Sequence, residues 1–169
     1  MESVKILLLS IAAAAAYGIV HDQFTARICL EYFTVFHPPI FATRSPTLLA
    51  IGWGVVATWW VGLFLGVLLT ISARVGSHPK LTVSDLYKSI ERLLLVMGAC
   101  AFLSGLTGYV LSGRGVVAPP SWILGIPDSI RDRFMADWWA HNASYASGIF
   151  GGLTLCVMTY YKRSQLPRA

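Results

Sequence analysis

Four stretches of apolar sequence without Asp, Glu, Lys or Arg constrain this chain more than any other feature. Three of them cover residues 47–73, 93–113 and 138–161, and a shorter one covers residues 6–20. A helix that crosses a bilayer needs about 20 mostly apolar residues, with a range of about 17–25. The three longer stretches meet this requirement, so each predicts a membrane-spanning helix.

The short first stretch fits two interpretations. Lys5, the apolar run and its alanine-rich end are similar to a secretory signal peptide. The alternative is a retained helix from about Ser3 to Asp22, because alanine is a strong helix former and small residues allow close helix packing in lipid. We expect the retained helix.

The composition supports a membrane protein. Only 12% of the 169 residues are charged, 56% are hydrophobic and the mean hydropathy is +0.64. Soluble domains carry about 25% charged residues, so this chain cannot cover a water-facing surface of its size. We therefore expect one all-α integral membrane domain, a bundle of four transmembrane helices. Its spans are predicted at about 4–21, 47–73, 90–113 and 138–161.

The distribution of charge predicts the orientation. With four spans, both termini and the loop 74–89 share one side, and this side with its helix ends carries eight basic and three acidic residues. The other side carries five of each. Excess Lys and Arg mark the cytoplasm, which places both termini inside and the loops 22–46 and 114–137 outside. The same rule explains the basic residues, so we expect the bilayer, and no nucleic acid, as a partner.

Local signals predict one helix start and the mode of packing. Thr82 followed by Asp85 is typical of a capping box and predicts that the third helix begins near Val83. The last three spans carry ladders of small residues, such as Gly148 and Gly152, that allow close helix contact in lipid. Such ladders suit the bundle itself, a homo-oligomer or contacts with other membrane subunits, and the sequence does not separate these.

Both outer loops are rich in aromatic residues and proline. We expect them to lie on the membrane surface or to cap the helices. In the second loop, Pro127 predicts the start of a short amphipathic helix that leads into the fourth span.

Polar and metal-competent side chains gather at the predicted outer ends of the first and last spans. Asp137, His141 and Tyr145 are spaced four apart and therefore share one helix face. Because ionisable groups near lipid are costly, they are usually buried among helices with partners. The candidate metal-ligating residues are His21, Asp22, Glu31, His37, Asp137 and His141.

Three interpretations of this cluster stay open. It is a structural cap in which Asp22 or Glu31 pairs with an arginine and the histidines bond to backbone carbonyls. Alternatively it binds Zn, Cu or Fe, for which histidine and carboxylate ligands are suited. The third interpretation is a b-type haem held by His21 and His141. Compact motifs that would identify an enzyme class, such as HExxH, CxxC or GxGxxG, do not occur.

The run HDQFTARICLEYFTVFHPP, residues 21–39, resembles a signature of uncharacterised small bacterial four-span membrane proteins. In that signature, H-D-Q-x-T-x-R leads into E-Y-F-T. The resemblance implies a multi-pass protein of the bacterial inner membrane, and it implies nothing about chemistry.

We expect a non-catalytic structural or accessory membrane subunit. The alternative is a metal-dependent or haem-dependent membrane enzyme that uses the outer cluster.

Overall fold

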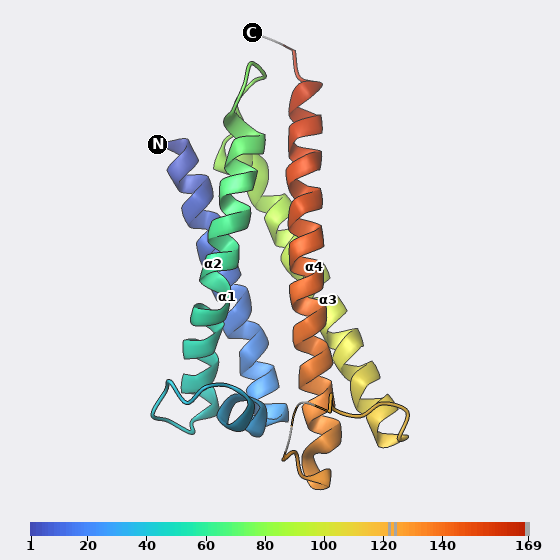
Figure 1. Cartoon of the computed structure of the whole chain (residues 1–169). Coiled ribbons are helices and arrows are strands. Elements are labelled where there is room, and N and C mark those ends of the chain that lie inside the picture. The colour runs from blue at the N-terminus through green and yellow to red at the C-terminus, as the bar shows by residue number, and fades with distance from the viewer. Residues whose placement is uncertain (122, 124, 168–169) are drawn as a thin grey trace.

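The computed structural model describes residues 1–121, 123 and 125–167, and the described residues are helical without strands. The four long helices are α1 (Glu2–Ile28), α2 (Pro46–Arg74), α3 (Val83–Gly113) and α4 (Arg131–Ser164). Two short elements lie in the longer connections, a π-helical turn at Tyr32–Phe36 and a 3-10 turn at Asp128–Ile130. Both of these connections lie at the same end of the molecule, opposite the end at which the chain begins (Figure 1).

The helices pack as two antiparallel pairs, α1 with α2 and α3 with α4 (Figure 1). In the first pair, a Cβ atom on Gly18 would lie 2.4 Å from the carbonyl oxygen of Gly54. In the second pair, a Cβ atom on Gly108 would lie 2.7 Å from the carbonyl oxygen of Met135. Glycine is therefore required at both positions, because any side chain would push the two backbones apart.

The small residues of α4 face inward, where they meet α2 and α3. Ser144, Gly148, Gly152 and Cys156 are all buried along one face of α4. A Cβ atom on Gly152 would lie 2.6 Å from the side chain of Leu65 in α2. This face therefore joins the two helix pairs within one chain.

Aromatic residues join the pairs at the loop end. The segment after α1 folds under the helices, and the aromatic-rich cap that we predicted packs against α2 and α4. We call this part the cap; its buried residues are Ala26, Cys29, Tyr32, Phe33, Leu49, Ala50, Trp53, Phe134 and Met135.

Helix starts follow the local signals. α3 begins at Val83 as predicted, and the Asp85 carboxylate accepts hydrogen bonds at 2.7 Å from the backbone nitrogen and the hydroxyl of Thr82. α2 begins at Pro46, whose missing N–H costs nothing at the first helical position.

Two predicted boundaries differ from the structure. α1 continues to Ile28, six residues beyond the predicted end near Asp22, so that residues 23–28 are helical where we had predicted a loop. The predicted short helix after Pro127 is a 3-10 turn that runs directly into α4. In both places polar sequence stays helical because the cap and the neighbouring helices bury one side of it.

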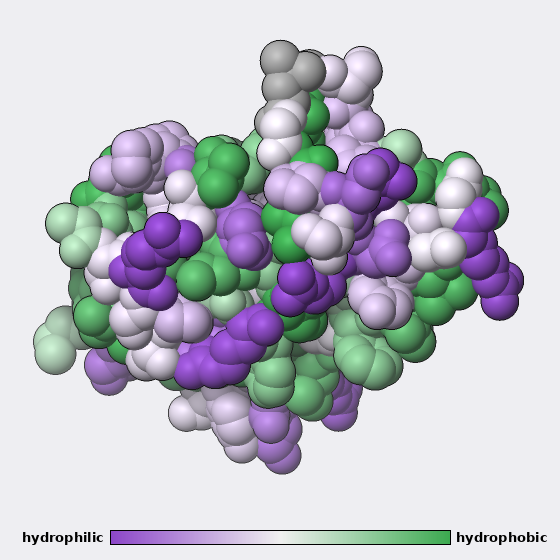
Figure 2. Space-filling model, turned by 90° about the horizontal axis from the view of Figure 1, so that it is seen from below, coloured by the Kyte–Doolittle hydropathy of each residue, from purple (hydrophilic) through white to green (hydrophobic). Residues whose placement is uncertain are grey.

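The chain is a multi-pass membrane protein on the criteria of helix length and composition. Among the described residues, α1, α2 and α3 are long and apolar enough to cross a membrane, and α4 is not among these helices. Large apolar side chains such as Leu95, Phe102 and Phe150 are exposed along the helices. On the loop end, hydrophilic side chains lie across the face with hydrophobic ones among them (Figure 2).

Candidate metal centre

The cluster forms where α4 crosses the last turns of α1. His21 and Asp22 are neighbours on α1, and His141 projects from α4. One ligand atom from each of these three residues lies within 4.8 Å of the others. The His21 and His141 ring centroids are 4.6 Å apart, with the rings at 83°. Residues from the two ends of the chain therefore meet in one site.

His141 is the most constrained of the three side chains. Its Nε2 atom lies 3.3 Å from Oδ1 of Asp22, and its Nδ1 atom lies 2.8 Å from the carbonyl oxygen of Asp137. The ring of Tyr32 stacks on it at 4.5 Å between centroids and covers it from the cap side. The imidazole is thus held in one orientation from two sides, as is usual for histidines that bind metals.

Behind His21 lies a short chain of hydroxyl groups. The Tyr17 and Ser144 hydroxyls are 2.8 Å apart. The Ser144 hydroxyl lies 3.5 Å from Nδ1 of His21, at the outer limit of a hydrogen bond, and Nε2 of His21 has no partner among the described residues. Neither nitrogen of His21 is therefore committed to a strong bond within the protein.

Asp137 lies beside the site as a buried carboxyl group. It is 0% exposed, and neither oxygen has a hydrogen-bond partner among the described residues. Its backbone carbonyl bonds to His141, and its carboxylate is not part of the three-residue group that could hold an ion. Asp137 therefore belongs to the surroundings of the site and is not placed as a ligand.

His37 and Glu31, which we predicted as members of the same cluster, lie in the cap instead. Nδ1 of His37 bonds to the carbonyl oxygen of Tyr32 at 2.8 Å, and its ring packs 4.6 Å from that of Trp53. Burial lowers the pKa of His37 from its ordinary value, so the ring is neutral at pH 7.

Glu31 accepts a hydrogen bond from the Cys29 thiol at 3.7 Å. Burial raises the pKa of Cys29 to about 11, so the thiol keeps its proton at pH 7. The only cysteine of the predicted outer side is therefore an inert core residue.

The expected pairing of Asp22 or Glu31 with an arginine is wrong for the described residues. Asp22 pairs with His141, and Arg131 pairs with Asp128. Arg27 bonds to Gln23 and to the Thr47 hydroxyl.

The arrangement of the two rings also bears on the haem alternative. A haem with two axial histidines lies between the imidazole rings, one on each side of the iron. The His21 and His141 rings touch edge to face and leave no space for a flat macrocycle between them. This site fits a single ion.

Three contributors were missed from the sequence: Tyr17, Ser144 and Tyr32. Two of them carried a detectable signal, because Tyr17 lies four residues before His21 and Ser144 lies three residues after His141. At these spacings side chains share a helix face. Tyr32 reaches His141 only through the fold of the cap, and no local pattern predicts that contact.

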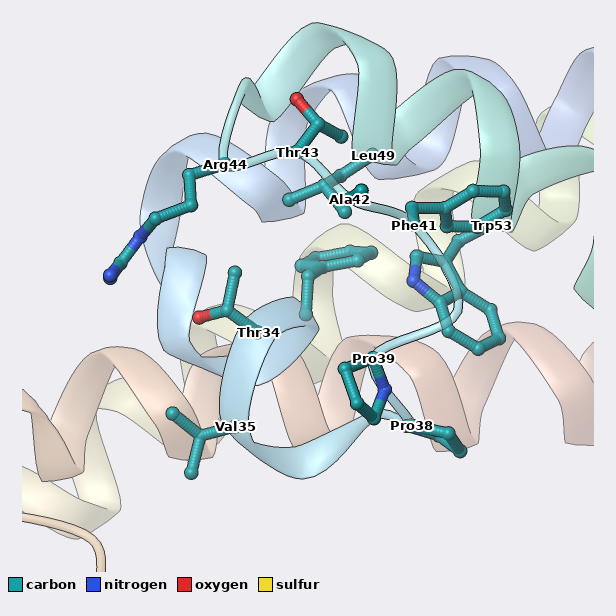
Figure 3. A pocket seen from close by; sticks show the side chains of 11 residues that line it. Thr34, Val35, Pro38, Pro39, Phe41, Ala42, Thr43, Arg44, Leu49 and Trp53 are labelled. Carbon is teal, nitrogen blue, oxygen red and sulfur yellow. The ribbon is translucent and has the colours of Figure 1, made fainter.

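The cap also holds an open pocket of about 430 Å³ beside Trp53. Figure 3 shows the Trp53 indole, Phe41 and the two prolines Pro38 and Pro39 around it, with Arg44 pointing away from it. His37 packs on Trp53, so this pocket lies next to the residues that cover the site.

No protein-family model, curated protein or solved structure matches the chain.

Proposed function

We propose that this chain is a four-span membrane protein that binds a divalent transition-metal ion through His21, Asp22 and His141. The observation that carries the proposal is the 3.3 Å contact between Nε2 of His141 and the Asp22 carboxylate. Nδ1 of the same ring bonds to a carbonyl oxygen, which only accepts. Nδ1 therefore carries the hydrogen, and Nε2 of a neutral ring turns its lone pair toward the carboxylate.

Two lone pairs at this distance repel each other unless a proton or a metal ion lies between them. A tetrahedral zinc ion holds its nitrogen and oxygen ligands at about 2.0–2.1 Å, which sets neighbouring ligands about 3.3 Å apart. The contact between His141 and Asp22 has this separation. His21 would complete the ligand set, because one of its ring nitrogens lies within 4.8 Å of the other two ligand atoms and its nitrogens have no strong partner.

The balance of buried charge supports a cation at this place. Asp22 is 5% exposed and Asp137 is 0% exposed, and neither forms an ion pair with Lys or Arg among the described residues. Buried carboxylates are usually paired or bound to a metal. A cation bound by Asp22 would offset the charge of that buried carboxylate.

The ligand set favours a metal-dependent enzyme over the non-catalytic subunit that we expected from the sequence. Two histidines and one carboxylate hold the metal in catalytic zinc sites and in non-haem iron(II) oxygenases. Three protein ligands leave coordination positions open, whereas structural zinc sites are closed by four.

A fourth crossing by α4 is part of the proposal. α4 has 34 residues, about 51 Å of helix, and packs along α3 and α2. In the C-terminal half of α4, the side chains of Phe150, Val157 and Met158 are exposed, which suits contact with lipid. With the excess of basic residues at the terminal end, this supports cytoplasmic termini and a site near the outer surface. The HDQFTAR…EYFT run supports a bacterial inner membrane.

Metal analysis of the purified protein tests the proposal. We expect about one zinc, iron or copper ion per chain by mass spectrometry, and a melting temperature that rises when the matching ion is added to chelator-treated protein. His141→Ala and Asp22→Asn should lose the ion, because each removes a ligand.

His78→Ala is the matched control, since His78 lies at the opposite end of the molecule, where its ring contacts Tyr160. This variant should keep its metal. If the wild type holds no metal, no divalent ion stabilises it, and Asp22→Asn still lowers the melting temperature, then a shared proton joins His141 and Asp22 and the metal site is wrong.

A further inference from the structure

Two hydroxyl groups connect α1 to α4 beside His21. The Tyr17 and Ser144 oxygens are 2.8 Å apart, the usual length of an O–H···O hydrogen bond. The Ser144 oxygen also lies 3.5 Å from Nδ1 of His21. The ring of Tyr17 stacks on that of His21, with the centroids 5.9 Å apart and the planes at 18°. The Ser144 hydroxyl therefore contacts both Tyr17 and a candidate ligand of the ion.

The packing of the helices does not explain the hydroxyl of Ser144. This residue belongs to the row of small buried residues on α4, in which Ala140 and Gly148 allow close contact without a polar group. Hydroxyl groups within helices commonly bond to a carbonyl of their own helix, as Ser147 does with that of Ala143 at 2.6 Å. The Ser144 hydroxyl instead contacts two side chains of α1. It is therefore directed at the residues of the candidate site.

The two histidines of the candidate metal centre have the same arrangement. Nδ1 of His141 bonds to the carbonyl oxygen of Asp137, and its Nε2 faces Asp22. Nδ1 of His21 faces the Ser144 hydroxyl, and its Nε2 is buried without a partner among the described residues. A hydrogen on Nε2 of His21 would be a buried donor with nothing to bond, which is costly. A hydrogen on Nδ1 has an acceptor.

We infer that Ser144 and Tyr17 are positioning residues for His21. Ser144 accepts the Nδ1 hydrogen of His21 and donates its own hydrogen to the Tyr17 oxygen. The neutral ring then keeps its lone pair on Nε2, and a metal binds histidine through such a lone pair. Histidines that bind metals usually donate their other N–H in this way, which fixes the tautomer and the orientation of the ring. The inference rests on the proposed function, because it concerns the same ion.

Two measurements on the full chain in lipid nanodiscs test this role. Nitrogen NMR of the metal-free protein with isotope-labelled histidine reports which ring nitrogen of each histidine carries the hydrogen, and His21→Gln assigns the signals of His21. Competition with a chelator of known affinity then measures the binding of zinc. In the metal-free wild type we expect the hydrogen of His21 on Nδ1.

Ser144→Ala should populate both tautomers of His21 and reduce the affinity for zinc about ten- to hundredfold, the usual effect of removing such a partner. Tyr17→Phe should reduce it less, because the Ser144 oxygen still accepts. Ser147→Ala is the matched control, since it is the same change three residues along α4, at a hydroxyl that bonds to its own helix. Both measurements should then equal those of the wild type.

A hydrogen on Nε2 of His21 in the metal-free wild type would overturn the inference, and so would an unchanged tautomer or zinc affinity in Ser144→Ala. A lower melting temperature of metal-free Ser144→Ala with unchanged zinc affinity would give Ser144 a structural role only. If the wild type binds no zinc, the proposed function fails, whereas the tautomers in the wild type and in Ser144→Ala still decide whether the two hydroxyls orient His21.

Discussion

At the scale of single residues, one buried arginine fixes the end of the molecule that lies opposite the cap. Arg163 of α4 is 0% exposed. Its Nη1 donates to the carbonyl of Ser72, and its Nη2 donates to those of Val75 and His78 at 2.7 and 3.2 Å. These carbonyls belong to the end of α2 and the residues after it, where the helix dipole favours a positive charge.

Arg163→Gln should therefore destabilise the protein. The shorter amide cannot reach all three carbonyls, and each buried acceptor left without a partner costs about 1–3 kcal/mol. We expect the melting temperature in detergent to fall by roughly 5 °C or more. Arg163→Lys should recover part of the loss, and Lys162→Gln, at an exposed neighbour, should have no effect. An Arg163→Gln protein that melts with the wild type would show that the carbonyls are satisfied in another way.

At the scale of the helices, contact between glycines decides how closely α1 and α2 approach. A Cβ on Gly54 would lie 2.4 Å from the backbone nitrogen of Ile19, which cannot move aside. By contrast, a Cβ on Gly148 would meet only the mobile end of Met97, at 3.0 Å. A substitution at Gly148 should therefore destabilise the protein less than the same substitution at Gly54, although Gly148 belongs to the ladder of small residues identified in the sequence.

Gly54→Leu should separate α1 from α2 and cost about 1–3 kcal/mol, the usual range for overpacking. Gly98→Ala is the control on another helix, because its Cβ meets nothing and alanine gains about 1 kcal/mol over glycine in a helix. Thermal melting of the two variants should move in opposite directions. A shift in the same direction for both would mean that helix propensity, and not the backbone contact, dominates.

The sequence predicted what local patterns control and missed what the packing of helices controls. The capping pair Thr82 and Asp85 acts within one turn, so the start of α3 was correct. The end of α1 was placed six residues early, because polar residues after Val20 look like a loop until α4 covers them. Likewise, Asp137 and His37 are polar residues near the correct end, but only the rotation of each element decides which of them faces His141.

At the scale of the whole molecule, the distribution of charge makes the orientation testable. In a cysteine-free background, single cysteines at Ser77 and Ser164 should resist a membrane-impermeant thiol reagent in intact cells, and one at Ser121 should react. Ser77 and Ser121 are exposed, so access is not limited by the fold. Labelling of the cysteine at position 77 in intact cells would contradict the proposed orientation. In permeabilised cells all three sites should react, which controls for reactivity.

The division of the molecule into two helix pairs has a consequence for its biogenesis. The hairpin of α1 and α2 enters the bilayer first, while His141 is still on the part of the chain to be inserted. Until the second hairpin arrives, His21 and Asp22 face lipid or water without their partner, and polar groups in that position are costly. The arrival of α4 removes this cost, so the nascent membrane protein has a built-in driving force for joining its two halves in the correct order. The metal ion that we propose could bind only after that step, because His141 is contributed by α4, which is made after α1.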